Sequence, residues 1–125
     1  MDLSAEALEN RFANALQRQD LAAAHDAAAE LRGRFASSEK GWVYGSMACL
    51  MGGDPAAGRA LVNEYLRRHP GSISALLQQA ECELALGQRM AALEAAATAR
   101  RLAAGNPSAL DAVGTFLTHA RDHLA

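Results

Sequence analysis

The stretch GWVYGSMACLMGGDP, residues 41–55, determines how the rest of the chain is interpreted. An apolar-rich run from Val43 to Met51 ends in the glycine pair and Asp-Pro of residues 52–55. The run is too short for a bilayer-spanning helix, which needs roughly 20 apolar residues. A phosphate-binding loop would need Lys and then Ser or Thr after the glycines, and neither is present. The stretch therefore predicts a buried helix followed by a turn, and no membrane insertion.

The composition indicates one compact, helical domain. Of the 125 residues, 50% are hydrophobic and only 5% are aromatic, while alanine, the best helix former, is the commonest residue. The net charge of −2 creates no field that would attract nucleic acid, so we expect no nucleic-acid partner. The core must therefore be built mainly from Ala and Leu side chains.

A repeat of 34 residues runs through the chain without an insertion. The shift aligns large residues at one position (Leu8, Trp42, Leu76, Leu110), turn residues at a second (Gln19, Gly53, Gly87, Arg121) and small residues at a third (Ala24, Gly58, Ala92). Breaks fall at 19–20, 33–38, 52–55, 70–71, 87–88 and 105–107, and the segments between them have helical length and periodicity. The pattern predicts an all-α chain with units 5–38, 39–72 and 73–106, followed by a helix in 107–125.

The unit 39–72 resembles a tetratricopeptide repeat (TPR). It has Trp42 at the fourth position, Gly53 at the turn, Gly58 at the twentieth position and Pro70 near its end. The resemblance implies that residues 1–125 form a single domain, a right-handed α-solenoid of three TPR-like units. The helix in 107–125 is then either a cap or half of a fourth unit. Asp20 and Asp54 are expected to cap the second helices of their units.

The resemblance also implies a ligand site on the concave wall formed by the first helices. The residues predicted for this peptide-binding groove are Glu9, Lys40, Val43, Tyr44, Met47, Met51, Leu77, Gln78 and Glu81. By register, Ser74, Ala112, Thr115 and His119 extend the same wall. Family members that hold a peptide's terminal carboxylate use Lys, Arg and Asn at positions occupied here by Glu9, Ala13, Tyr44, Ser74 and Gln78, so this clamp is absent. We expect a protein or peptide partner with apolar anchors and some basic character.

No residue pattern indicates catalysis, a cofactor or a metal site in this chain. His119 and His123 are one helical turn apart, but two solvated histidines are the simpler interpretation. Cys49 falls at a helix position expected to lie in the core, and Cys49 and Cys82 have no metal-ligand spacing. Two free thiols and no basic, apolar start resembling a signal peptide favour the cytoplasm.

Three other interpretations stay open at the level of sequence. Alanine- and arginine-rich TPR-like arrays of bacterial style often precede catalytic domains such as sulfotransferases and glycosyltransferases, so the chain could be the N-terminal array of a larger enzyme. It could also be a secretion-type chaperone that shields an apolar segment of its client. Finally, the groove or the C-terminal helix could form a homodimer.

Overall fold

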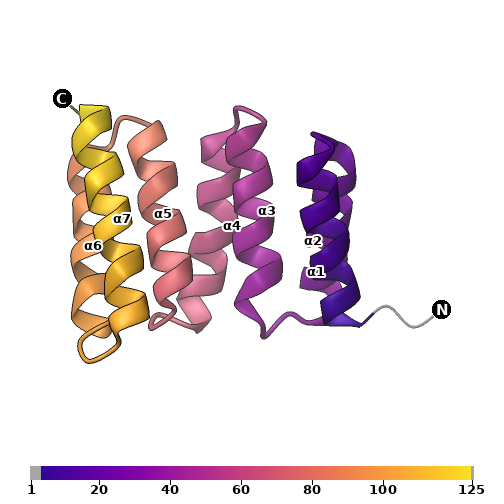
Figure 1. Ribbon diagram of the computed structural model, residues 1–125, viewed down its shortest axis with the longest axis horizontal. Helices are drawn as coiled ribbons and strands as arrows, with labels where there is room; N and C mark the ends of the chain where they lie inside the picture. Colours follow the sequence, from indigo (N-terminus) through magenta and orange to yellow (C-terminus); the bar gives the residue numbers. More distant parts are fainter. Residues whose placement is uncertain (1–3, 125) are drawn as a thin grey trace.

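The computed structural model describes residues 4–124, and side chains as far as residue 122. The helices are α1 (Ala5–Gln17), α2 (Leu21–Arg34), α3 (Glu39–Met51), α4 (Pro55–Arg68), α5 (Ile73–Ala85), α6 (Arg89–Leu102) and α7 (Pro107–Leu124). They stack as successive helical hairpins from the N-terminal pair to α7 (Figure 1). The described residues contain no strand, and the expected all-α helical-repeat solenoid is confirmed.

Serine caps begin the first helix of each complete unit. Ser4, Ser38 and Ser72 are each 34 residues apart, and their hydroxyls accept hydrogen bonds from the backbone of Ala7, Lys40 and Ala75 at 3.1, 3.3 and 3.2 Å. Each bond satisfies a backbone N–H that has no partner inside its helix. The start of each unit is therefore determined by a residue directly before its first helix.

The second helices begin as the sequence predicts in two of the three units. Asp20 accepts from the Ala23 backbone and Asp54 from the Ala57 backbone, both at 3.1 Å. In α6, Gln88 occupies the same place and makes no side-chain cap. The expected capping role of the two aspartates is confirmed.

The turn between the two helices of a unit needs a left-handed residue. Gln19, Gly53 and Gly87 occupy this position with φ of 57°, 83° and 76°. Glycine adopts this conformation without the steric cost that Gln19 bears. Arg121, the fourth residue in the alignment, lies inside α7, so α7 has 18 residues whereas α1, α3 and α5 have 13 each.

Two glycines let α3 approach α2 closely. A Cβ added at Gly41 would lie 2.6 Å from the backbone nitrogen of Arg32, and one at Gly45 would overlap the Arg32 guanidinium. The guanidinium donates to the Gly41 carbonyl at 3.1 Å and lies 5.9 Å from the centre of the Trp42 ring. Burial lowers the pKa of Arg32. We call this contact, formed by Arg32, Gly41, Gly45 and Trp42, the glycine joint.

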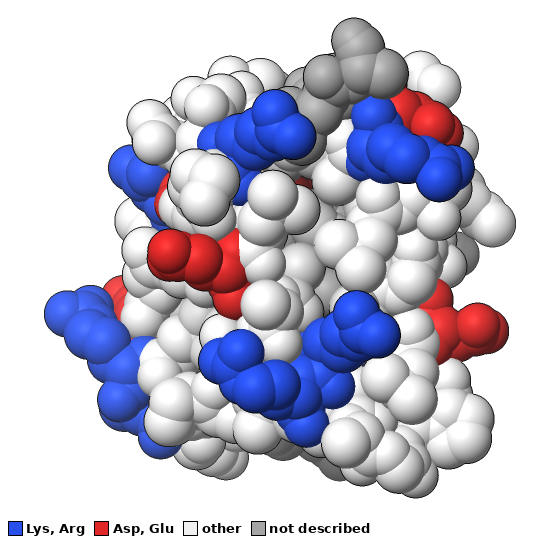
Figure 2. Space-filling view, turned by 90° about the vertical axis from the view of Figure 1, so that its left-hand side faces the viewer, with Lys and Arg blue, Asp and Glu red and all other residues white. Residues whose placement is uncertain are grey.

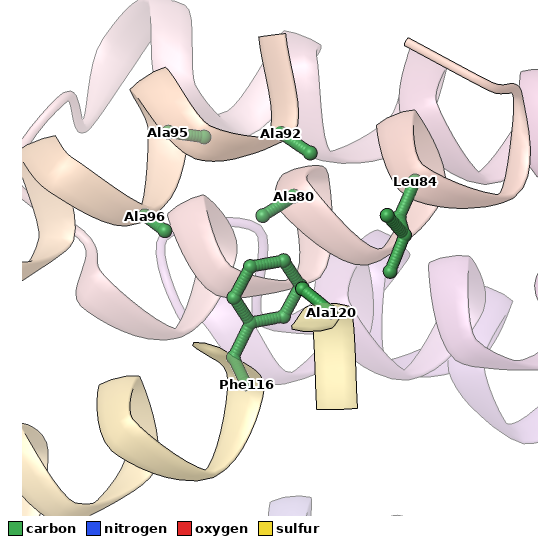
Figure 3. Close-up of a cluster of buried hydrophobic side chains, with 7 residues drawn as sticks. All are labelled: Ala80, Leu84, Ala92, Ala95, Ala96, Phe116 and Ala120. Carbon is green, nitrogen blue, oxygen red and sulfur yellow. The ribbon is translucent and has the colours of Figure 1, made fainter. Parts of the chain in front are cut away.

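The C-terminal part of the core is built from alanines around one ring. Phe116 of α7 points toward α5 and α6 and is 4% exposed (Figure 3). Its buried cluster consists of Ala80, Leu84, Ala92, Ala95, Ala96, Phe116 and Ala120. We call this cluster the alanine joint. Because its alanines are small, a single aromatic ring provides much of the volume that fills the space between the helices.

The expected burial of Cys49 is wrong. Cys49 is only partly buried, while its neighbour Ala48 is fully buried against Phe12, Ala15 and Ala24. A helix turns about 100° per residue, so the two adjacent side chains point in different directions, and Ala48 is the one that faces this cluster. Trp42, at 8% exposure, is in the core as expected.

Among the described residues, no helix has the length and apolar character needed to cross a membrane.

Candidate functional site

The first helix of the third unit and the C-terminal helix enclose an open hollow. It lies between α5 and α7 and has a volume of about 570 Å³. Its lining is Ser74, Leu77, Gln78, Glu81, Ala112, Thr115, Phe116 and His119. Seven of these eight were expected on the concave wall from the register of the repeat, and the eighth, Phe116, reaches the hollow from the alanine joint. We call this feature the α5–α7 hollow.

The floor of the α5–α7 hollow is apolar, and the side-chain amide of Gln78 in it already makes a hydrogen bond. Leu77 is half-buried and packs against two core clusters, one of which contains Phe116. Gln78, predicted as a groove residue, is only 9% exposed, and its Nε2 donates to the Ser46 hydroxyl of α3 at 3.2 Å. Gln78 therefore shapes the floor and ties α5 to α3, rather than presenting a free amide.

The rim of the hollow carries an acid and an imidazole from different helices. An Oε2 atom of Glu81 lies 3.5 Å from Nε2 of His119, which makes an ion pair when the imidazole is protonated. His123, the other histidine of the metal hypothesis, lies outside the described side chains. Within the described residues, no group of three or more His, Cys, Asp or Glu side chains could hold a metal ion.

The groove residues of α3 are more buried than the sequence suggested. The Tyr44 ring stacks on Phe12 of α1, with centroids 4.6 Å apart and planes 6° from parallel. Met47 packs on the same cluster, whereas Val43 packs on the cluster of Trp42 and Tyr65. These three side chains join units together. Met51, at 57% exposure, is the α3 member that offers a large apolar surface to a ligand.

Glu9 and Lys40, both predicted groove residues, bind each other. Lys40 Nζ of α3 lies 2.6 Å from Glu9 Oε1 of α1, and this hydrogen bond raises the pKa of Lys40. The pair connects the first and second units and cancels two charges that we expected to face a ligand separately. Of the acidic groups predicted on the groove, Glu81 is the one located at the α5–α7 hollow.

A second hollow, of about 550 Å³, was not predicted from the sequence. It is lined by Ser38, Glu39, Lys40, Tyr65, His69, Gly71 and Ser72, at the starts of α3 and α5. The Ser72 hydroxyl donates to Glu39 at 2.5 Å, and the Tyr65 hydroxyl donates to the Ser37 carbonyl at 3.1 Å. The 34-residue spacing of the two capping serines, Ser38 and Ser72, was the sequence feature that could have predicted this second hollow. These polar groups are engaged in holding adjacent units together.

The two thiols lack the properties of a nucleophile. Both cysteines are free, and burial raises the pKa of Cys49 and of Cys82. Cys82 Sγ lies 3.3 Å from the Ser46 hydroxyl in the interior. Reactive cysteines have a lowered pKa, so the raised pKa of both thiols argues against a nucleophilic role.

Comparison with known proteins supports the fold. No family model matches the sequence, and no curated protein matches it either. Among solved structures, the TPR2B domain of yeast Sti1, in complex with pHsp70, matches with a TM-score of 0.81. The match covers 97% of this chain and 98% of that one, at 20% sequence identity. The chain therefore has a TPR-like fold, as the repeat predicted.

Proposed function

We propose that this chain is a protein–protein interaction scaffold, not an enzyme, and that its concave groove binds a peptide or protein segment. The observation that carries the proposal is the α5–α7 hollow, an open site lined by side chains from the first helices of two units. A solved TPR domain with the same fold, that of Sti1, was determined in complex with pHsp70. That complex supports a binding role for this type of fold, and the partner of this chain is inferred from its own residues.

The lining of the hollow suggests the chemistry of the partner. Leu77 and Phe116 form an apolar floor, on which one apolar side chain of a ligand can rest. Ser74 adds an exposed hydroxyl at the edge, suited to hydrogen bonds with a peptide backbone, and the Thr115 hydroxyl, which donates to the Asp111 carbonyl at 3.0 Å, can still accept one. Glu81 favours a Lys or Arg next to the apolar anchor. The proposed ligand is thus an apolar residue flanked by a basic one.

The rest of the groove supports a second, weaker anchor. Met51 exposes a flexible thioether at the far end of α3, which can adapt to different apolar side chains. The Glu9–Lys40 pair leaves the α1 end close to neutral. Because the positions of a carboxylate clamp hold Glu9, Ala13, Tyr44, Ser74 and Gln78, we propose that the ligand is bound through an internal segment rather than its C-terminal carboxylate.

We further propose that binding takes place in the cytoplasm. Cys49 and Cys82 are free, and Cys82 is fully buried beside Ser46 and Gln78. A buried free thiol is compatible with a reducing compartment. Fractionation of cells that produce the full-length protein would test this location directly.

Selection from a random peptide display library tests the groove even while the natural partner is unidentified. The wild-type chain should enrich peptides with an apolar residue next to Lys or Arg, and these should bind with micromolar affinity in calorimetry. Ala112→Arg places a long cation into the hollow from an exposed helix position, so it should weaken binding of the enriched peptides by about tenfold or more. Glu81→Gln should reduce the preference for the basic residue.

Ala97→Arg is the matched control, because Ala97 is an exposed alanine inside α6 and does not line the hollow. It should leave peptide affinity unchanged. Circular dichroism should show that both variants are as helical as the wild type. Failure to enrich any motif, or equal binding by the Ala112→Arg and wild-type chains, would contradict a peptide site in the α5–α7 hollow.

A further inference from the structure

A further hollow lies on the side of α5 that faces away from the α5–α7 hollow. It has a volume of about 620 Å³, and its lining is Ala60, Asn63, Leu66, Arg67 and Gln79. Gln79 comes from α5 and the other four residues come from α4. Gln79 is two residues from both Leu77 and Glu81, and two residues turn a helix by about 200°, so its side chain points away from theirs. We call this feature the outer hollow.

The amides of Asn63 and Gln79 form the polar part of the outer hollow. Both side chains are half-buried, and Gln79 Nε2 donates to Asn63 Oδ1 at 2.7 Å. This bond uses one end of each amide. Within the described residues, the Asn63 Nδ2 group and the Gln79 Oε1 atom have no other hydrogen-bond partner, and both reach solvent. The outer hollow therefore offers one amide donor and one amide acceptor to a ligand.

Arg67 adds a positive charge at the rim of the outer hollow. Its side chain is exposed and makes no ion pair or hydrogen bond with any described residue. Glu64, on the same helix, lies 4.0 Å from Arg68. Glu83 of α5 lies 2.8 Å from Arg59. These two acids are thus paired with other arginines, and the charge of Arg67 remains available to a partner.

The glycine joint shows a different use of arginine at the preceding junction of units. Arg32 is partly buried there, and its guanidinium packs against Gly45, the equivalent of Gln79. In the next unit Leu66 takes the place of Arg32, and the arginine follows one position later, at Arg67. One arginine therefore joins two units, whereas the other lies outside the packing.

Asn63 is an unusual residue for its place in the repeat. The equivalent residues of the other two units are Ala29 and Ala97. Alanine is the better helix former, so helix stability does not account for an asparagine inside α4. The contact of Asn63 with Gln79 uses only its oxygen, which leaves the NH₂ group for a ligand.

More arginines lie at the same edge of the molecule, one unit further along the chain. Arg100 and Arg101 occupy the last turn of α6, as Arg67 and Arg68 do in α4. Within the described residues, neither Arg100 nor Arg101 pairs with a carboxylate. Figure 2 views the α6–α7 end, and the lowest charged side chains in that view are Lys or Arg, at the level where α6 ends in Figure 1. This edge therefore attracts anions, although the whole chain has a net charge of −2.

We propose that the outer hollow binds an acidic segment of a partner protein, with one Asp or Glu side chain of that segment in the hollow. Arg67 and the Asn63 NH₂ group are one helical turn apart on α4, and both donate the hydrogen bonds that a carboxylate accepts. The Gln79 Oε1 atom suits a backbone N–H of the same segment, a donor that a phosphate backbone lacks. The inference does not depend on what the α5–α7 hollow binds.

NMR spectra of isotope-labelled protein test the proposal. The probe is an end-capped peptide with several glutamates, and its twin has glutamines in their place. The glutamate peptide should shift the side-chain amide signals of Asn63 and Gln79 and bind at least about tenfold more tightly than its twin. Arg67→Gln should weaken binding by about tenfold, and Asn63→Ala by about threefold, because each removes a donor to the carboxylate.

Arg89→Gln is the matched control for the loss of one positive charge. Arg89 is exposed at the start of α6 and does not line the outer hollow. The control should keep the affinity within about twofold, since salt screens distant exposed charges. Ala112→Arg, which fills the α5–α7 hollow, should also leave this affinity unchanged, so the two sites are tested separately. Circular dichroism should show that every variant is as helical as the wild type.

The proposal would be overturned by equal binding of the two peptides, or by equal binding to the wild type and Arg67→Gln. Free acetate at the same carboxylate concentration should shift the amide signals much less. Equal shifts would mean that the outer hollow takes any small anion and would overturn a protein partner. A thymidine oligonucleotide that binds more tightly than the glutamate peptide, with the same dependence on Arg67, would overturn it in favour of a nucleic acid.

Discussion

The glycine joint and the alanine joint bring helices together in opposite ways. At the glycine joint, Gly41 and Gly45 remove side chains so that α3 can lie close to α2, and the large groups Arg32 and Trp42 fill the space beside them. At the alanine joint, most of the buried side chains are alanines, and Phe116 together with Leu84 fills the space between the helices. The first joint should therefore be sensitive to added atoms and the second to removed ones.

The largest expected effect is at the alanine joint. Phe116→Ala should lower the free energy of unfolding by about 3–5 kcal/mol, because most of the buried side chains around the ring are alanines, which cannot extend to fill the cavity. Urea denaturation followed by circular dichroism measures the change. Phe116→Leu, which keeps most of the volume, should cost much less and keeps the test valid if the alanine variant does not fold. A small loss for Phe116→Ala would show that the joint can collapse.

The second largest effect is expected when a side-chain atom is added at the glycine joint. Gly41→Ala should lower the free energy of unfolding by about 1–3 kcal/mol, because the new Cβ would lie 2.6 Å from the Arg32 backbone, which cannot move as a side chain can. Gly33→Ala, on the neighbouring helix with open space, is the control and should not destabilise the chain. Equal melting curves for Gly41→Ala and the wild type would contradict the close approach of α2 and α3.

A smaller effect concerns the polar contact between the two joints. Ser46→Ala should cost about 1–2 kcal/mol, because the buried Gln78 amide loses the hydroxyl that accepts from it. Ser46→Ala combined with Gln78→Met should cost less than the sum of the two single changes. A double-mutant cycle in urea measures this coupling. Strict additivity would show that the amide and the hydroxyl act independently.

The smallest expected effect is an increase in stability. Gly114→Ala should raise the free energy of unfolding of the monomer by about 0.5–1 kcal/mol, since alanine loses less backbone entropy in a helix and its Cβ meets nothing here. Thermal unfolding followed by circular dichroism measures this gain. A destabilised monomer would mean that α7 does not have the open outer face that the structure describes.

The repeat predicts which residues line the candidate site, but it does not predict the hydrogen bonds that these residues make. The register placed Leu77, Gln78 and Glu81 on one wall together with residues of the last helix, and the α5–α7 hollow contains them. The register did not reveal that Gln78 is bonded to Ser46 or that Glu9 is bonded to Lys40. Both contacts join side chains more than 30 residues apart, and their geometry depends on how the units stack.

The sequence by itself determined where the helices begin and end. Serine and aspartate caps, left-handed glycines and the apolar period act within a few residues, so they are readable without the neighbouring units. Tertiary structure alone decided which groove side chains remain available and that the Arg32 guanidinium lies against Gly41, Gly45 and the Trp42 ring. The physical reason is distance. Local hydrogen bonds set each helix, but burial and pairing depend on the spacing between helices that the packed alanines and glycines allow.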